Sequence, residues 1–302
     1  MNRTAADKAL LRIYASGCAC FYPTAAFRGE PDALTAMPSR DMIEKKQKSE
    51  RECNMTKEVS QTVINALRLL ECFTREEELG ITELAAEIGA GKAVAARLVG
   101  SLTEFGYLRQ NPKTRKYRLG LRLMYWGELV KERSELVQVA EPYLRELSQE
   151  FQLTTHLAIL EHHSPLIVCK VAMGPIVYMD SRVGSTLPTH ACATGKCLLA
   201  FEHQRVLAEF LNSRPLVQLT QHTITEPDAF LREIELIRQR GYAVDDEESN
   251  EGLSCMAVPL LNGDGRAVAA VSISGQSPAV QKNQREILQR LRETQQKISI
   301  FL

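Results

Sequence analysis

The stretch from Val63 to Gly120 constrains the fold most strongly, because three helical patterns follow one another there with very little sequence between them. In the first pattern apolar residues recur at helical spacing: Val63, Ala66, Leu67, Leu70 and Phe73. The second is the short segment ITELAAEIG, in which we expect Thr82 to be the N-cap and Gly89 to end the helix. After a tight turn comes a third helix, whose apolar face we expect to consist of Val94, Leu98, Leu102 and Phe105.

A hairpin pattern comes directly after the third helix. The segment YLRQNPKTRKYRLG reads as two short strands around a turn at Asn111-Pro112. Three helices with a short turn between the second and the third, followed by a hairpin, predict a winged helix-turn-helix. The hairpin carries cations with no acid among them: Arg109, Lys113, Arg115, Lys116 and Arg118. Such a run often marks only a solvated face, but beside a helix-turn-helix it favours a wing that neutralises DNA phosphates.

The glycines at 89 and 91 raise the alternative of a nucleotide-binding loop. The pattern G-x-x-x-x-G-K-[ST] fails here, because Ala86 occupies its first glycine position and Ala93 its hydroxyl position. A helix N-terminus nevertheless favours an anion, so we expect Lys92 to meet the phosphates of a duplex. The outward face of the helix is expected to comprise Lys92, Ala93, Ala96, Gly100 and Thr103, with Arg97 at its flank. Arg97 is the best candidate for a bidentate guanine contact, and a phosphate contact is its alternative role.

The sequence after the hairpin predicts a second domain. A long helical segment extends from Leu121 to about Gln149 with a break or a new first turn at Pro142, and Leu121, Leu123 and Trp126 are candidates to pack on a partner chain. Two hairpins follow, THLAILEHHSPLIVCKVAMG and SCMAVPLLNGDGRAVAAVSISG, the second turning at 262–265. Helices are expected near 195–201 and 228–240 and at the C-terminus. Hairpins with helices between them predict an α+β domain on an antiparallel sheet.

Composition sets further limits. The chain has 302 residues, enough for two domains, and a formal net charge of zero, so any basic footprint is local. The longest apolar runs are strand-sized, which argues against a membrane span. Eight cysteines without a regular framework fit reduced thiols in a cytoplasm. Residues 1–54 show no sustained apolar period, and we expect a disordered extension. The stretch 15–18 resembles a lipoprotein cleavage box, but Arg12 splits the apolar run before it.

Several segments between Val59 and Leu302 resemble the IclR family of transcriptional regulators: GITELAAEIGAGKAVAARLVGSLTEFGYL, KYRLGLRLMYWG, SRVGSTLPTHACATGKCLLAF, TITEPDAFLREIELIRQRGYAVDDEESNEGLSCMAVPL and AVAAVSISG. The resemblance implies a winged helix-turn-helix over 59–121, a linker helix over 122–135 and a GAF-like effector-binding domain over 136–302. It also implies a dimer or a dimer of dimers that binds double-stranded operator DNA and a small-molecule effector. No cofactor and no membrane partner is expected.

The resemblance also implies an effector site between the loop before a helix and several strand side chains. The matching positions are Ala193, Thr194, Asp245, Cys255, Ser272 and Ser274. The residue chemistry favours a small hydroxy-, keto- or sugar acid, because a helix N-terminus holds a carboxylate and serine hydroxyls on one strand face donate to it. If the second hairpin turns between Gly263 and Asp264, Cys255 lies opposite Ser272. The alternatives are ordinary satisfied hydroxyls, a solvated acidic turn at 245–248 and a cysteine packed as core.

A thiol-dependent enzyme that uses Cys192 or Cys255 with His190 is the competing prediction. Cysteine–histidine catalysis needs both groups in contact and a third group that orients the base, and no cysteine-protease signature surrounds these residues. A zinc site at His162 and His163 lacks C-x-x-C and H-x-x-x-H spacings, so no metal is expected. The sequence therefore favours a DNA-binding regulator over an enzyme.

Overall fold

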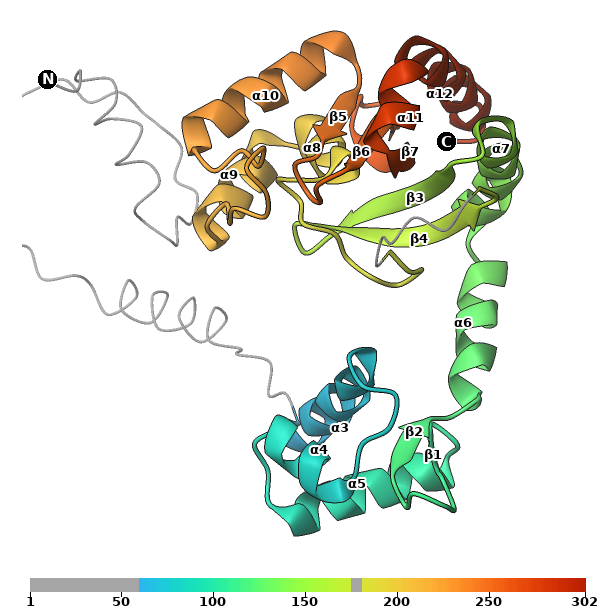
Figure 1. The fold of residues 1–302 in the computed structure, drawn as a ribbon, viewed down its shortest axis with the longest axis vertical. Coiled ribbons are helices and arrows are strands. Elements are labelled where there is room, and N and C mark those ends of the chain that lie inside the picture. The colour runs from blue at the N-terminus through green and yellow to red at the C-terminus, as the bar shows by residue number, and fades with distance from the viewer. Residues whose placement is uncertain (1–59, 175–180) are drawn as a thin grey trace, which may run out of the picture. The chain divides into compact units, whose positions relative to one another are not determined.

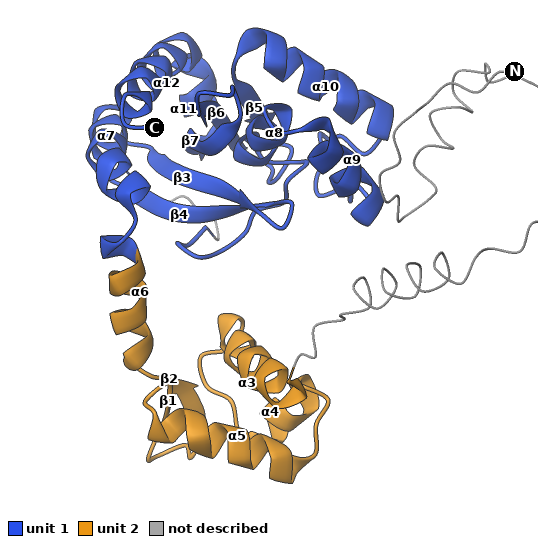
Figure 2. Ribbon diagram, turned by 180° about the vertical axis from the view of Figure 1, so that it is seen from behind, with its two compact units in different colours: residues 1–19, 131–302 blue, residues 20–130 orange. Residues whose placement is uncertain are grey.

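The computed structural model describes residues 60–174 and 181–302 (Figure 1). Within these residues the chain forms two compact units that divide between Val130 and Lys131, as Figure 2 shows. The prediction for residues 1–54 lies outside the described residues.

The smaller unit has the helices and the hairpin that the sequence predicts. Its elements are α3 (Gln61–Glu71), the 3-10 helix η1 (Cys72–Thr74), α4 (Ile81–Glu87), α5 (Lys92–Glu104), β1 (Leu108–Gln110) and β2 (Tyr117–Leu119). The two strands pair antiparallel, with Arg109 opposite Arg118. The prediction of a winged helix-turn-helix is thereby confirmed.

The core of the smaller unit differs from the prediction at α5 and α4. On α5 the buried side chains are Ala95, Leu98 and Val99, with Val94 and Leu102 partly buried beside them. Phe105 follows the last turn of α5 and is 70% exposed, so its assignment to the apolar face is wrong. The prediction of Thr82 as N-cap is also wrong. Gly80 is the N-cap of α4, and its N–H donates to Glu83 Oε2 at 2.6 Å.

The long helical segment is two helices, α6 (Arg122–Glu132) and α7 (Glu135–Phe151). The helical segment is interrupted at Ser134, which is the N-cap of α7. Its hydroxyl accepts a hydrogen bond from Val137 N at 3.4 Å. Pro142 lies inside α7, so the predicted break there is wrong. Proline in a helix interior costs about 3 kcal/mol, and burial of the apolar face of α7 against the sheet offsets that cost.

The larger unit is an antiparallel sheet with helices, as predicted, and the helices cover both faces. Its further elements are β3 (Thr154–Glu161), β4 (Ser164–Ala172), α8 (Ala193–Ala200), α9 (Gln204–Ser213), α10 (Pro227–Arg240), β5 (Ala243–Asp246), β6 (Leu253–Leu261), β7 (Ala267–Gln276), α11 (Ser277–Lys282) and α12 (Gln284–Ser299). The strand order is β4-β3-β7-β6-β5. The sequence reading did not include α9.

Each face of this sheet has its own core, because side chains alternate along the strands. Met256 and Val258 of β6 pack with α7, α11 and α12 on one face. Cys255 and Ala257 point to the other face, where α8 and residues of α9 and α10 cover them (Figure 1). The second face carries the polar residues that the sequence singles out.

The register of β6 and β7 differs from the prediction by two residues. Cys255 lies opposite Ser274, and Ser272 lies opposite Ala257. One residue of this difference comes from a bulge between Leu260 and Leu261. The other comes from the turn, which is centred on Asp264 because Leu261 lies opposite Ala267. A shift of two keeps every side chain on the predicted face, so the predicted neighbours stay together.

Candidate functional site

The N-terminal half of α5 presents an exposed surface of small and basic residues. Lys92 opens the helix, and Gly91 precedes it without a side-chain cap. The predicted outward residues Lys92, Ala93 and Gly100 are exposed, as is Arg97 at the flank, and Ala96 is half-buried. Thr103 was predicted to face outward, but it is half-buried and its Oγ1 donates to Val99 O at 2.7 Å. The surface that can approach a DNA groove therefore lies within the first turns of α5.

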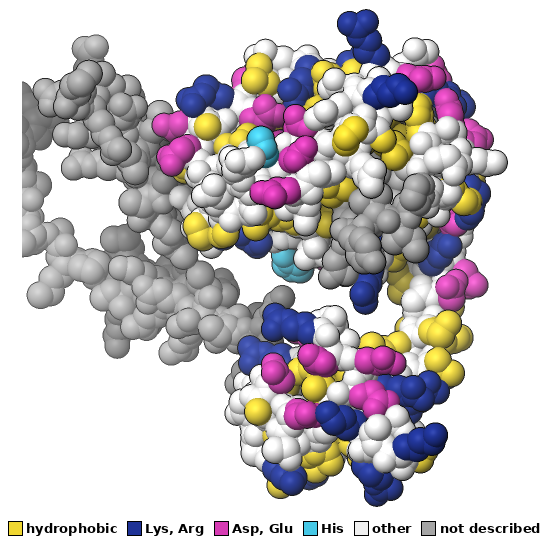
Figure 3. All heavy atoms as spheres, viewed as in Figure 1, with side chains coloured by type: hydrophobic (Ala, Val, Ile, Leu, Met, Phe, Trp, Pro, Cys, Tyr) yellow, Lys and Arg dark blue, Asp and Glu magenta, His cyan; other side chains and the backbone are white. Residues whose placement is uncertain are grey.

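The turn of the hairpin is held by an acidic residue from outside it. Glu78 accepts hydrogen bonds from Asn111 Nδ2 at 2.7 Å and from Thr114 Oγ1 at 2.8 Å. These bonds, the one from Asn111 first, hold the pKa of the Glu78 carboxyl below its usual value. Lys113 and Arg115 are exposed in this turn, and Figure 3 shows Lys and Arg side chains on the visible face of the smaller unit. Lys113 and Arg115 are thus exposed on a turn whose conformation is fixed by hydrogen bonds to Glu78.

Lys116, unlike the exposed Lys113 and Arg115, has an acidic partner among the described residues. Its Nζ contacts Glu83 Oε1 at 3.0 Å, and the two side chains are 42% and 48% exposed. Glu83 is the residue that also accepts from the N–H of Gly80. Lys116 therefore joins the wing to α4.

A polar cluster lies on the α8 face of the sheet in the larger unit. Asp245, Cys255 and Ser274 are register neighbours on β5, β6 and β7, and Ser272 is opposite His156 of β3. Each of these side chains is buried, with exposed fractions of 8% or less. Asp245 is fully buried, so the alternative of a solvated turn at this residue is wrong. The strands bring the four predicted strand residues together.

The first turn of α8 supplies the other two predicted effector residues. Ala193 and Thr194 are buried, and Ala193 belongs to the same apolar cluster as Cys255. The thiol of Cys192 caps the helix by accepting from Gly195 N at 3.3 Å. A Cβ on Gly195 would lie 2.4 Å from Thr189 O, so the chain approaches α8 here more closely than any other residue allows.

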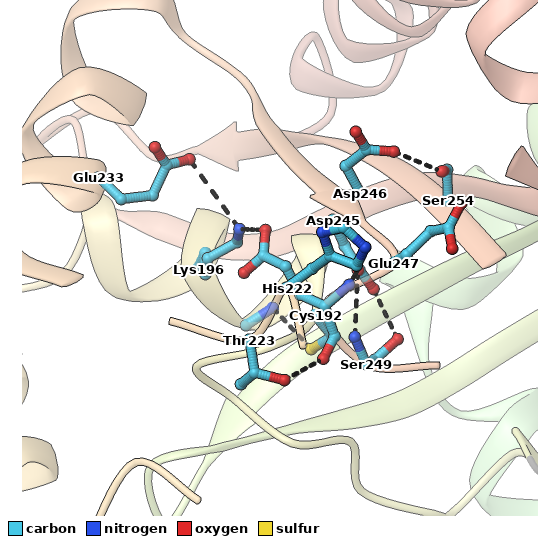
Figure 4. A network of polar contacts seen from close by, with 12 residues as sticks. Cys192, Lys196, His222, Thr223, Glu233, Asp245, Asp246, Glu247, Ser249 and Ser254 are labelled. Atoms are coloured by element: carbon cyan, nitrogen blue, oxygen red, sulfur yellow. Dashed lines mark hydrogen bonds and ion pairs between the residues drawn. The ribbon is translucent and has the colours of Figure 1, made fainter. Parts of the chain in front are cut away.

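Asp245 holds the loop that follows β5. Its Oδ1 accepts from Glu248 N at 2.8 Å and from Ser249 N at 3.3 Å, and its Oδ2 accepts from Ser249 Oγ at 2.7 Å (Figure 4). Burial raises the pKa of the carboxyl, although these hydrogen bonds oppose the rise. Asp245 therefore shapes this loop as well as facing the polar cluster.

A buried ion pair that the sequence reading missed fixes α8 to the same loop. The side chain of Lys196 is fully buried, and its Nζ contacts Glu248 Oε1 and lies 3.9 Å from Glu233 Oε1 (Figure 4). Burial raises the pKa of Glu248 to about 7, although the charge of Lys196 acts against the rise. Glu233 in turn contacts Arg240 at 2.7 Å. A lysine inside the apolar helix ATGKCLLA and the acidic stretch DDEE were the signals available in the sequence.

His156 is the second residue that the sequence reading missed. It is 2% exposed, and its ring nitrogens lie 3.1 Å from Ser181 Oγ and 3.3 Å from Ser274 Oγ. Burial, and next the charge of Lys170, lower the pKa of His156 to about 3, so the ring is neutral at physiological pH. Strand alternation places His156 on the same face as Ala158, which could have signalled its position.

The contacts of His190 and the environments of Cys192 and Cys255 do not match those of a cysteine–histidine enzyme. His190 Nε2 donates to Val217 O at 2.8 Å. Burial raises the pKa of Cys192 to about 12 and that of Cys255 well above its usual value, whereas a nucleophilic thiol needs a lowered pKa. Within residues 60–174 and 181–302, no group of three His, Cys, Asp or Glu side chains could hold a metal ion. No helix in these same ranges is long and apolar enough to cross a membrane.

Comparison with known proteins finds a matching family model for each of the two units. Residues 129–300 match the family model described as the bacterial transcriptional regulator IclR C-terminal, and residues 62–112 match the IclR helix-turn-helix domain. The chain is 35% identical over 217 residues to the HTH-type transcriptional regulator XynR of Escherichia coli (strain K12), covering 72% of this chain and 86% of XynR. It is 33% identical over 213 residues to the HTH-type transcriptional regulator KdgR of Dickeya chrysanthemi, covering 70% of each chain.

A solved structure shares the fold as well. An IclR homologue from Microbacterium hydrocarbonoxydans, crystallised in complex with 4-hydroxybenzoate, superposes with a TM-score of 0.68 at 28% identity, covering 80% of this chain and 98% of the homologue. A helix-turn-helix unit joined to an effector-binding unit defines a DNA-binding transcriptional regulator. The chain belongs to the IclR family.

Proposed function

We propose that a small hydroxy-, keto- or sugar acid binds at the polar cluster and controls binding of the protein to operator DNA. The observation that carries the proposal is the placement of Ser272 and Ser274, two buried hydroxyls on one strand face, in the sheet that packs against α8. A ligand group that hydrogen-bonds to these buried hydroxyls stabilises the complex.

The first turn of α8 favours an acid as the ligand. In the described part of the chain, Cys192 caps the N–H of Gly195, while the N–H groups of Ala193 and Thr194 make no hydrogen bond. Free N–H groups at the positive end of a helix dipole attract a carboxylate. The homologue in complex with 4-hydroxybenzoate holds a hydroxy acid, which supports this class of ligand.

The effector-binding experiment compares two sets of serine variants. Ser272→Ala with Ser274→Ala removes the cluster hydroxyls, and isothermal calorimetry against a panel of hydroxy, keto and sugar acids, 4-hydroxybenzoate included, measures binding. Loss of a hydroxyl that meets a charged ligand group costs about 1.5–3 kcal/mol of binding. Ser254→Ala is the matched control, because Ser254 is equally buried but donates to Asp246 Oδ1 on the other face of the sheet. If the double variant binds every acid as the wild type does, the site is elsewhere.

For DNA, we propose that α5 lies in the major groove and that the wing contacts the backbone. Arg97 is exposed on α5 among small residues, so we assign it the bidentate guanine contact, worth about 1–3 kcal/mol of discrimination. Lys92, Lys113 and Arg115 are assigned to phosphates. The test measures binding of Arg97→Ala and Lys113→Ala to the operator and to its single-base variants. Arg97→Ala should reduce the differences in affinity between the operator and its single-base variants. An equal loss of affinity on every sequence would mean that Arg97 contacts phosphate.

We also propose that the protein acts as a homo-oligomer, because α6 buries none of its residues in the described chain. Its exposed large apolar side chains are Met124, Tyr125, Trp126 and Val130, and Leu121 is exposed directly before it. Exposed apolar patches of this kind mark interaction surfaces, and a second copy of the chain is the partner we assign to it. Trp126→Lys should shift the sedimentation coefficient toward that of the monomer, and an unchanged coefficient would exclude α6 from the interface.

A further inference from the structure

A chain of hydrogen bonds with a fixed direction begins at Lys170 on β4. Its Nζ lies 2.9 Å from Ser181 Oγ and also contacts the carbonyl oxygen of Ser181. An ammonium group only donates, so Ser181 Oγ accepts at this contact. The hydroxyl of Ser181 has one hydrogen of its own to donate.

The acceptor for that hydrogen is His156. Ser181 is 2% exposed, and among the described residues Nε2 of His156, at 3.1 Å, is the acceptor that its hydroxyl reaches. If Nε2 carried a proton instead, the hydrogen of Ser181 would be left buried without an acceptor there, which costs about 1–3 kcal/mol. Nε2 is therefore the unprotonated nitrogen of the ring.

The second ring nitrogen then has to be a donor. His156 is neutral because burial and the neighbouring charge of Lys170 disfavour the imidazolium, and a neutral imidazole carries one N–H. With Nε2 accepting, the proton sits on Nδ1, which lies 3.3 Å from Ser274 Oγ. Ser274 Oγ accepts from Nδ1, and its own hydrogen stays available as a donor.

We propose that His156 is a positioning residue whose Nδ1–H tautomer makes Ser274 a hydrogen-bond donor to the effector. The inference rests on the proposed function for its consequence but not for its geometry. The neighbour of Ser274 on β6 is Cys255, and a thiol sulfur is a weak acceptor. A carboxylate or keto oxygen is a much stronger acceptor for the same hydrogen. The site therefore favours ligands that place an acceptor oxygen at Ser274, because that oxygen receives the free hydrogen of Ser274.

The experiment reads the tautomer directly in the full-length, ligand-free protein. Long-range 1H–15N correlation spectra of histidine-labelled protein distinguish Nδ1–H, Nε2–H and imidazolium rings, and His156→Gln assigns the resonance by its loss. We expect a single Nδ1–H ring that does not titrate between pH 5 and 8. The Lys170→Met and Ser181→Ala variants should each add the Nε2–H form, because the hydrogen bonds from Lys170 through Ser181 then no longer fix which ring nitrogen accepts.

Two outcomes would overturn the inference. One is an Nε2–H or imidazolium form of His156 in the wild-type protein, and the other is an unchanged Nδ1–H ring in both Lys170→Met and Ser181→Ala. Because no effector is present in these spectra, an error in the effector class or in DNA binding leaves this result intact. An error in the proposed function would instead show in the calorimetry, as equal binding of the acids by the wild type and the double serine variant.

Discussion

Replacing Lys196 with Met tests how the buried ion pair holds α8. Methionine keeps most of the length of the side chain and removes its charge. Lys196 is fully buried, and Glu248 would lose its cation while its Oε2 already has no hydrogen-bond partner. Glu233 keeps Arg240 at 2.7 Å. The variant therefore leaves the carboxyl of Glu248 without its cation, while the more distant charge of Lys196 is also lost to Asp245.

The expected size of the effect depends on pH. Removing one partner of a buried ion pair costs about 3–5 kcal/mol. The pKa of Glu248 in the folded protein is already raised to about 7 by burial, with Lys196 opposing the rise, so the variant raises it further. A raised pKa in the folded state contributes stability below the unfolded value, and this stability is lost as pH rises through the folded value. The penalty of Lys196→Met should therefore fall from pH 9 to pH 5.5, by about 1.4 kcal/mol for each pH unit of added shift.

Urea unfolding followed by circular dichroism at pH 9 and pH 5.5 measures this penalty. The control is the double variant Lys196→Met with Glu248→Gln, which removes both charges and should be less destabilised than the single variant at pH 9. The reasoning fails if the single variant loses the same stability at both pH values. It fails equally if the double variant is as unstable as the single one.

Two further predictions follow from contacts in each unit. Gly195→Ala forces a Cβ to within 2.4 Å of Thr189 O, so we expect a loss of about 1–3 kcal/mol and a melting temperature lower by several degrees in calorimetry; an unchanged value would mean that the backbone moves freely there. Lys113→Ala should lower the slope of log K for DNA binding against log salt concentration by about one unit. Lys116→Ala should lower it by less, because Lys116 already contacts Glu83. Equal slopes in the two variants would show that DNA displaces the Lys116–Glu83 ion pair.

Most of the fold follows from the sequence because its periodicities are strong, and the failures have local causes. At α4, both Gly80 and Thr82 suit an N-cap, and propensity alone does not choose between them. Pro142 signals a break, but burial of the apolar face of α7 keeps that helix intact. The register error at Cys255 and Ser272 has two causes, the bulge near Leu261 and a hairpin turn centred on Asp264, and alternation of side chains reveals neither.

The arrangement of the candidate site could be predicted in part for the same reason. Alternation along β7 places Ser272 and Ser274 on one face, and that parity survives an error of two residues in the register. The role of Asp245 in holding its own loop depends on how the chain turns back at Ser249, which has no periodic signal. His156 and Lys196 escaped notice because a buried histidine or lysine is recognised only by the partners that the fold brings to it.

Operator binding with and without effector tests directly whether the acid controls DNA binding. Fluorescence anisotropy with DNA from beside the gene gives the Kd of the wild-type protein, first alone and then saturated with the acid that binds most tightly in calorimetry. We predict that the acid changes the Kd for DNA in the wild-type protein. The variant with Ser272→Ala and Ser274→Ala should bind the DNA equally well but not respond to the acid. An unchanged Kd in the wild-type protein at saturating acid, or a full response in the double variant, would contradict it.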